Sequence, residues 1–295
     1  MTSVAAVLLV LTAWQVAFIC GYVALRIADR DRRASRRGGA RRTPGTVDDL
    51  ARSPLWWRRA EAARRAGDIA RLGDRELLYT LLDDVHAAVQ SDATSSLETL
   101  LDAPAVGHLL DRLPERPMAV RLQQHALLAR ALPLTTSALM QRLAPDASPR
   151  RLKSWIALVE TLESAALFAR VGSLHSHPDP LIRLSVARAL KRHRDPEAEE
   201  MLLIALRDHD WRVRAVAARS LGTLGNATAV PRLAGGLRDV RWWVRFRCGL
   251  ALAQLGEEGR RALADARRDP DRYAGEMATM IGGLSTASVT ELADG

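Results

Sequence analysis

Cysteine is scarce in this sequence, with only Cys20 and Cys248 among 295 residues. Two isolated cysteines exclude a disulfide framework and the paired-cysteine pattern of a zinc site. Aromatic residues make up 4% of the chain, and Val and Ile do not gather into alternating runs, so no β-sheet is predicted. Alanine, leucine and arginine dominate instead, and their high helix propensity predicts an all-α protein.

Charge is missing from one part of the chain and concentrated in the next. Residues 1–25 contain no Asp, Glu, Lys or Arg, whereas residues 26–65 contain 13 Arg and five acidic residues, a balance of +8. Because the whole chain carries +9, everything after residue 65 is nearly neutral. The basicity therefore belongs to one segment and not to a nucleic-acid-binding surface spread over the body of the protein.

The uncharged residues 4–25 have the length of a membrane-spanning helix. At about 1.5 Å per residue such a helix measures about 33 Å, which matches a hydrocarbon core of about 30 Å. No positive charge precedes this stretch and no small-x-small cleavage site follows it. A retained transmembrane anchor within residues 1–28 is therefore favoured over a cleaved signal peptide or a buried core helix.

Arginines gather directly after this predicted span. They are Arg26, Arg30, Arg32, Arg33, Arg36, Arg37, Arg41 and Arg42. The positive-inside rule places this side in the cytoplasm, which predicts a single-pass protein of the plasma (inner) membrane with its N-terminus outside. Residues 29–53 are rich in Arg, Gly, Ser, Thr and Pro, and are expected to be a flexible linker.

An internal repeat organises the remainder of the chain. Similar segments begin at Asp179, Asp210 and Arg241, at a constant spacing, and their apolar residues recur with the period of a helix. The two aspartates stand at N-cap positions, and Gly225 and Gly256 are expected to end the first helix of a unit in the left-handed conformation. Each unit thus predicts two helices whose apolar faces are buried only when units stack.

The period weakens away from these three units. A segment near Asp271 continues it one residue short, residues 148–162 read as a slipped copy, and residues 53–67 and 74–89 read as helical but degenerate. We therefore predict an α-solenoid of stacked antiparallel helix pairs over residues 54–284, with a period of about 31, and a polar tail at residues 285–295.

These units resemble HEAT repeats, particularly the short HEAT-like repeats named after phycobilisome lyases. Residues 210–233 follow the pattern D-x-x-V-R-x-x-A-x-x-A-L-G, with a second helix beginning near A-V-P-x-L, almost throughout. The resemblance is strong over residues 177–256, moderate over about 117–285, and absent from the predicted span. It implies inter-repeat ladders that by position involve Asp179, Asp210, Arg183, Arg214 and Arg245. Arg241 stands where the third aspartate should be, which puts that rung in doubt.

Signatures of catalysis or metal binding are few. His175 and His177 stand two residues apart, but no further ligands lie near them at ligand spacing, so no metal and no cofactor is expected. The paired His-Glu dipeptides of the iron hydroxylases built on HEAT-like repeats do not occur, and neither does a G-x-S-x-G, P-loop or dinucleotide fingerprint. We therefore do not expect an enzyme.

Tryptophans and arginines at the starts of the first helices form a candidate partner-binding stripe. The set comprises Trp211, Trp242, Trp243, Arg212, Arg214 and Arg245. Such a stripe is either a protein-binding hot spot or inter-repeat packing. Trp56 and Trp57, beside further arginines, either dock at the bilayer interface or cap the solenoid.

Together these features favour a membrane-anchored, non-catalytic scaffold or adaptor that binds a partner protein, for which a membrane enzyme complex is one candidate. A chromophore-lyase-like or other enzyme on a HEAT-like scaffold is one alternative, and it requires a pocket of convergent acid/base groups that the sequence does not show. Nucleic-acid binding by the Arg/Trp surface is another, and the nearly neutral body of the chain argues against it.

Overall fold

The computed structural model describes residues 46–69, 74–162 and 164–294. The chain divides into two units, Met1–Asp49 and Leu50–Gly295. The predicted membrane span, its flanking arginines and most of the predicted linker lie outside the described residues. Within the part that is described, no helix has both the length and the apolar character needed to cross a membrane.

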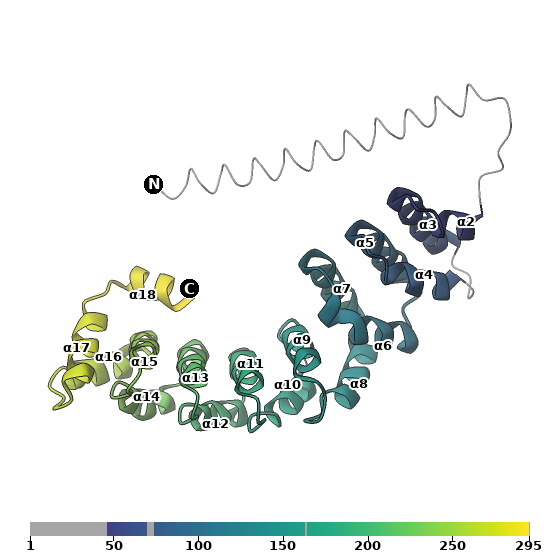
Figure 1. Cartoon of the computed structure of the whole chain (residues 1–295). Coiled ribbons are helices and arrows are strands. Elements are labelled where there is room, and N and C mark those ends of the chain that lie inside the picture. Colours follow the sequence, from purple (N-terminus) through teal and green to yellow (C-terminus); the bar gives the residue numbers. More distant parts are fainter. Residues whose placement is uncertain (1–45, 70–73, 163, 295) are drawn as a thin grey trace, which may run out of the picture. The chain divides into compact units, whose positions relative to one another are not determined.

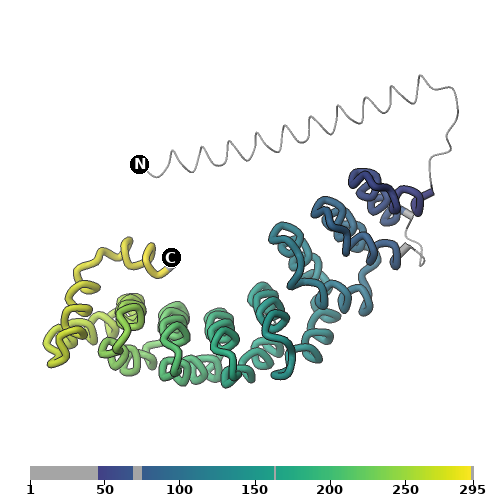
Figure 2. Tube along the Cα trace, viewed as in Figure 1, coloured from purple at the N-terminus to yellow at the C-terminus, as the bar shows by residue number. Residues whose placement is uncertain are grey.

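The second unit is a solenoid of helix pairs arranged in two rows (Figures 1 and 2). The first helices of the pairs are α3 (Trp56–Ile69), α5 (Ala87–Ser96), α7 (Met118–Arg130), α9 (Pro149–Val159), α11 (Pro180–Leu190), α13 (Trp211–Leu224), α15 (Trp242–Gln254) and α17 (Arg272–Gly282). The second helices are α4 (Asp74–Leu82), α6 (Ala103–Arg112), α8 (Leu132–Arg142), α10 (Ala165–Gly172), α12 (Pro196–Ala205), α14 (Val230–Gly236) and α16 (Gly256–Ala266). Short 3-10 turns, η1 (Leu97–Thr99), η2 (Leu113–Glu115) and η3 (Ala227–Ala229), lie between some of them. The described residues contain no strand, and the predicted all-α solenoid is confirmed.

The repeat is more regular than the sequence suggests. From α3 to α15 every first helix begins at the same interval after the previous one, and only α17 begins one residue early. Residues 53–67 and 148–162, expected to be degenerate or slipped, therefore contain helices that start in register. The register is hidden because side chains vary at equivalent positions: Arg151 is exposed where Ile182, one period later, is buried.

The N-caps and the glycine stops of the helices lie where the sequence predicts. Asp179 and Asp210 each accept a hydrogen bond from a backbone N–H two residues on, both at 2.8 Å. Gly225 ends α13 with φ 75° and Gly256 follows α15 with φ 67°, a left-handed conformation that glycine adopts without steric cost.

The core lies between the two rows of helices. Aligned apolar residues of the three clearest repeats are each at most 1% exposed, namely Ile182, Val186, Val213, Ala217, Val244 and Cys248. Full burial of a Val or Ile side chain contributes about 1.5–3 kcal/mol. The helices also approach closely, because a Cβ on Gly222 of α13 would lie 2.9 Å from the Cα of Ala251 in α15.

Two segments expected to be irregular contain helices. The end of the predicted linker forms α2 (Val47–Ala51). The predicted polar tail contains α18 (Thr286–Asp294), which packs against α15 and buries Val289 and Ala293. Two apolar residues four apart are too few to show as a helical period in the sequence, but they suffice to pack one turn of a helix against its neighbour.

Candidate partner-binding surface

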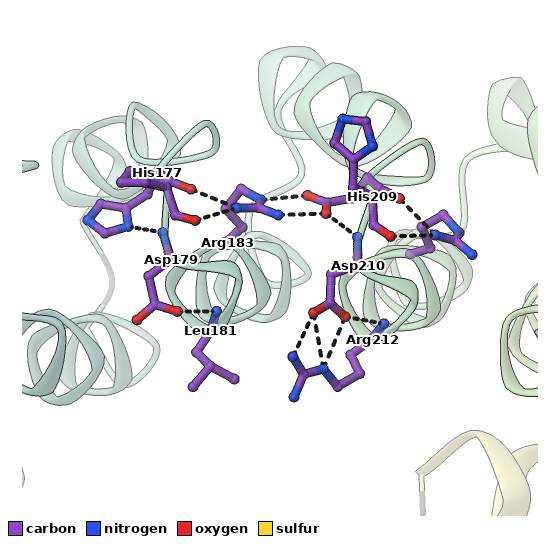
Figure 3. A network of polar contacts seen from close by, with 10 residues as sticks. His177, Asp179, Leu181, Arg183, His209, Asp210 and Arg212 are labelled. Atoms are coloured by element: carbon purple, nitrogen blue, oxygen red, sulfur yellow. Dashed lines mark hydrogen bonds and ion pairs between the residues drawn. The ribbon is translucent and has the colours of Figure 1, made fainter.

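Arginines of the first helices tie successive repeats together through the intervening loops (Figure 3). Arg183 of α11 donates from Nε to Oδ2 of Asp208 at 2.6 Å and from Nη2 to Oδ1 at 2.7 Å. Its Nη1 donates to the backbone oxygen of His177 at 2.9 Å. Arg214 of α13 repeats this arrangement one period later, with Asp239 at 2.7 and 2.8 Å. Such bidentate pairs have a defined geometry, so they hold the first helices in a fixed relation.

The carboxylates of this ladder are not the ones that the family resemblance implies. Asp179 and Asp210 cap their own helices, whereas the ladder uses Asp208 and Asp239, which stand two residues before the cap position. An N-cap carboxylate is already engaged by the amides of its own helix, so the previous repeat is held by a different aspartate. The constant sequence separation between each arginine and its aspartate, the same in both rungs, is the sequence signal.

The same ladder spacing occurs at the N-terminal end of the solenoid. Arg59 of α3 pairs with Asp84 at 2.5 Å and donates to the backbone oxygen of Ser53. Trp56 therefore occupies the helix position of Trp211 and Trp242. This part of the chain therefore carries the ladder of the repeat, although Leu55 stands at the cap position of Asp179 and Asp210.

The ladder carboxylates remain ionised at neutral pH. Burial pushes the pKa of Asp208 upward, but hydrogen bonds from Arg183 and from the backbone N–H of Asp210 outweigh it, so the pKa lies below its ordinary value. The balance is the same for the pKa of Asp239, with Arg214 as the partner. The rungs are therefore ion pairs at physiological pH.

An aromatic cluster is exposed at the start of α15. Trp242 and Trp243 are 44% and 52% exposed, and their rings meet edge to face with centroids 4.9 Å apart. Trp242 also stacks on Phe246, one turn further along α15, at 4.9 Å. In α17, Tyr273 occupies the helix position of Trp243 and is 60% exposed. Clusters of exposed aromatic side chains are typical of binding surfaces.

The six predicted stripe residues have different environments. Trp211 is half-buried at the start of α13. Arg212 is exposed and pairs with Asp210 at 2.6 Å within its own turn. Arg214 is a ladder residue, so its guanidinium is already paired. Of the six, only Trp242 and Trp243 form an exposed aromatic pair. Arg245 is only 8% exposed, and its Cζ lies 4.9 Å from the ring centroid of Tyr273.

Sequence reasoning missed Tyr273 and Phe246 as members of this surface. The repeat that precedes Tyr273 is one residue shorter than the others, which hides its equivalence to Trp243. Phe246 lies one turn into α15, and i, i+4 spacing from Trp242 was the signal that could have identified it.

Trp56 and Trp57 are fixed by local ring contacts. Trp56 stacks on His86, at the N-cap of α5, with centroids 4.3 Å apart and parallel planes. It also meets Trp57 edge to face at 6.0 Å. These contacts cover part of the end of the solenoid, while Trp56 keeps 38% of its surface exposed.

The two histidines considered as metal ligands form hydrogen bonds with backbone groups instead. Nδ1 of His177 accepts from the N–H of Asp179 at 3.0 Å, which leaves the proton on Nε2 to be donated to the backbone oxygen of Pro145 at 3.2 Å. Nδ1 of His175 lies 3.1 Å from the backbone oxygen of Gly172. Among the described residues, no group of three or more His, Cys, Asp or Glu side chains could hold a metal ion.

A cavity of about 720 Å³ lies along α12, away from the aromatic cluster. Its walls include His175, Met201, Ile204, Arg207, His209 and Arg232. The ladder residues Arg183 and Asp208 also line it, and their charged groups are paired with each other.

Comparison with known proteins identifies the repeat type. Residues 168–253 and 199–280 match the family model of HEAT repeats. An uncharacterized phycocyanin operon protein Z from Pseudanabaena tenuis (strain PCC 7409) is 30% identical over 125 residues, which cover 39% of this chain and 62% of that protein, less than two thirds of its length. The chain thus carries HEAT-like repeats within residues 168–280.

Two solved structures are also similar to the chain. Human deoxyhypusine hydroxylase in complex with glycerol has 21% identity and a TM-score of 0.34, with 83% of this chain and 96% of that chain covered. The complex of CpcE and CpcF of phycocyanin lyase from Nostoc sp. PCC7120 has 17% identity and a TM-score of 0.35, with 83% and 95% covered.

Proposed function

We propose that this chain is a membrane-anchored, non-catalytic scaffold whose HEAT-like solenoid binds a partner protein. The observation that carries the proposal is the exposed pair of Trp242 and Trp243, which packs with Phe246 on rigidly connected repeats. Tryptophan and tyrosine dominate the binding energy of protein interfaces. Their exposure to water is unfavourable in the free protein and is relieved when a partner covers them.

The ladder favours a scaffold because it limits the cost of binding. The Arg183–Asp208 and Arg214–Asp239 rungs fix α11, α13 and α15 relative to each other. The edge-to-face contact of Trp242 with Trp243 also restricts their side-chain rotamers. A surface that is ordered before binding loses less conformational entropy when the partner arrives.

The membrane anchor in this proposal rests on the sequence alone. Residues 4–25 contain no charge, and the arginines that follow them place the solenoid on the cytoplasmic side of the plasma (inner) membrane by the positive-inside rule. One anchor would restrict the solenoid to the membrane surface, where the search for a membrane-bound partner is two-dimensional.

Affinity capture of the full-length protein from solubilised membranes tests the scaffold. We expect a stoichiometric protein partner with the wild type and its loss with the double variant Trp242→Ala, Trp243→Ala. The matched control is Met118→Ala, Leu122→Ala on α7, because these side chains are also exposed and apolar but lie outside the cluster. Recovery of the same partner with both double variants would refute the assigned surface.

A reporter fused to the C-terminus tests the anchor and its direction. The proposal expects activity from a reporter that works only in the cytoplasm, and release of the protein from membranes by detergent but not by high salt. Extraction by salt or alkali alone would exclude the span, and activity only of an exported reporter would reverse the topology.

A further inference from the structure

One rung of the arginine ladder is incomplete next to the aromatic cluster. Arg245 of α15 is equivalent to Arg183 and Arg214, and its Nη1 donates to the backbone oxygen of Asp239 at 2.7 Å, as the other rungs do to theirs. Within the described part of the chain, however, no carboxylate pairs with Arg245, and its buried Nε has no hydrogen-bond partner.

The carboxylate that would complete this rung is already engaged. Asp269 occupies the position of Asp208 and Asp239 before α17, and its Oδ1 accepts from the N–H of Asp271 at 2.9 Å. It pairs instead with Arg238, whose Nη2 lies 2.7 Å from Oδ2. The loops before α13, α15 and α17 have the same length, but the repeat formed by α15 and α16 is one residue shorter than the others. Asp269 therefore stands one position closer to Arg245 in the sequence than Asp239 stands to Arg214.

The buried guanidinium of Arg245 has an N–H group without an acceptor among the described residues. An arginine donates five N–H bonds and cannot lose its charge in a protein. Arg245 is only 8% exposed, and a buried donor without an acceptor costs free energy. The ring of Tyr273 covers its Cζ at 4.9 Å, which is a favourable cation–π position but satisfies none of these N–H groups.

The surroundings of Arg245 suit a carboxylate carried by a peptide. In the other rungs the equivalent guanidinium receives an aspartate from the following loop, whereas at Arg245 the exposed ring of Tyr273 lies over the guanidinium. Val240 and Trp243, close to Arg245 in the sequence, are 86% and 52% exposed.

The three aspartates of the adjoining loops, Asp239, Asp269 and Asp271, do not fill this position. The charge of Arg245 helps to lower the pKa of Asp239, but both carboxylate oxygens of Asp239 accept hydrogen bonds from Arg214. Asp269 is held in the same way by Arg238. Asp271 caps α17 by accepting from the N–H of Ala274. A carboxylate that completes this rung must therefore come from another molecule, and it reaches the solvent-inaccessible Nε only when the ring of Tyr273 moves aside.

We propose that Arg245 binds an acidic side chain of the partner protein, which displaces the ring of Tyr273 and completes the rung in trans, while a neighbouring aliphatic or aromatic residue of the partner packs on the exposed pair Trp242 and Trp243. This inference rests on the proposed function, because it assigns the chemistry of the partner at the same surface. It identifies the partner segment as an extended peptide with Asp or Glu next to a large apolar residue.

Selection of displayed random heptapeptides on the full-length protein in detergent tests this chemistry. We expect enrichment of Asp or Glu beside Trp, Phe, Leu or Met, and at least a tenfold weaker binding of a selected synthetic peptide when its acid is replaced by the matching amide. Arg245→Gln should remove that discrimination. Arg241→Gln is the matched control, because it removes the same charge from the N-cap of α15 and should retain the discrimination.

A second variant supplies the missing carboxylate within the chain. Tyr273→Glu places an acid where the ring now covers Arg245, so it should raise the melting temperature and abolish peptide binding. Retained binding by Tyr273→Glu, or equal loss in Arg245→Gln and Arg241→Gln, would overturn the inference.

Two further outcomes separate this inference from its alternatives. Binding of inorganic phosphate that depends on Arg245, without selection of acidic peptides, would indicate an anion site of another class and overturn the peptide assignment. A captured membrane partner that depends on Trp242 and Trp243 but not on Arg245 would leave the scaffold function standing and refute only the carboxylate.

Discussion

Arg183 in α11 holds Asp208, from the loop before α13, through two hydrogen bonds of 2.6 and 2.7 Å. This pairing recurs at Arg214 and Asp239 and stops at Arg245. The solenoid thus combines complete rungs, which are structural, with one incomplete rung beside exposed aromatic side chains. The same repeated arginine is paired in three units, those of Arg59, Arg183 and Arg214, and at Arg245 has no carboxylate partner among the described residues.

The first prediction compares complete and incomplete rungs. Arg214→Met should lower the free energy of unfolding by about 2 kcal/mol, between the values for exposed and buried ion pairs, because Asp239 is left mostly buried without its partner. Arg245→Met removes no carboxylate pair and should cost about 1 kcal/mol or less. Urea denaturation followed by circular dichroism measures both, and equal losses would contradict the distinction.

The second prediction concerns the cap of α13. Asp210→Ala removes the oxygen that accepts from the N–H of Arg212 at 2.8 Å and should cost about 1 kcal/mol, whereas Asp210→Asn keeps a capping oxygen and should cost less. Both changes also remove the exposed pair with Arg212, so their difference isolates the cap. Thermal melting distinguishes them, and a larger loss with Asn than with Ala would show that the ion pair matters more.

The third prediction tests the close approach of α13 and α15. Gly222→Ala should destabilise the protein, because the new Cβ would lie 2.9 Å from the Cα of Ala251 and the backbone must shift. Gly235→Ala in α14 meets no atom within 4 Å and should stabilise by about 0.5 kcal/mol through its higher helix propensity. Opposite changes in melting temperature are therefore expected from the same chemical substitution.

The fourth prediction is a pH dependence. Burial, together with the charge of Arg121, lowers the pKa of His125 in α7 to about 4, while the unfolded chain has an ordinary value of about 6.5. Between these values the unfolded state binds the proton and the folded state does not, so the free energy of unfolding should fall by up to about 3 kcal/mol as the pH falls from about 6.5 to 4. Denaturation curves across this range measure the effect.

A control variant assigns this pH dependence to one residue. His125→Leu removes the titrating group and should flatten stability between pH 6.5 and 4. The ladder aspartates act in a lower window, because the pKa values of Asp208 and Asp239 are depressed by their arginines. Their stabilisation is present above about pH 4 and is lost at more acid pH. If the free energy of unfolding of His125→Leu depended on pH as it does in the wild type, another group would cause the effect.

Local signals in the sequence were sufficient to predict the helices of the central repeats. The caps at Asp179 and Asp210 and the stops at Gly225 and Gly256 depend on backbone conformations that a single residue favours. The apolar period depends only on helix geometry. The sequence by itself therefore determined the fold class and the length of the repeat unit.

Only the tertiary structure decided which groups meet between units. The packing of neighbouring helices decides which aspartate holds each arginine and buries Val289 in α18. It also leaves Trp243 exposed, whereas Trp211 is half-buried. Equivalent residues in a repeat have equal local propensities but different neighbours: Asp269, in the position of Asp208 and Asp239, pairs with Arg238 and not with Arg245. Arg245 was identifiable in the sequence as a repeat residue, but its missing partner became visible only when the helices were packed together.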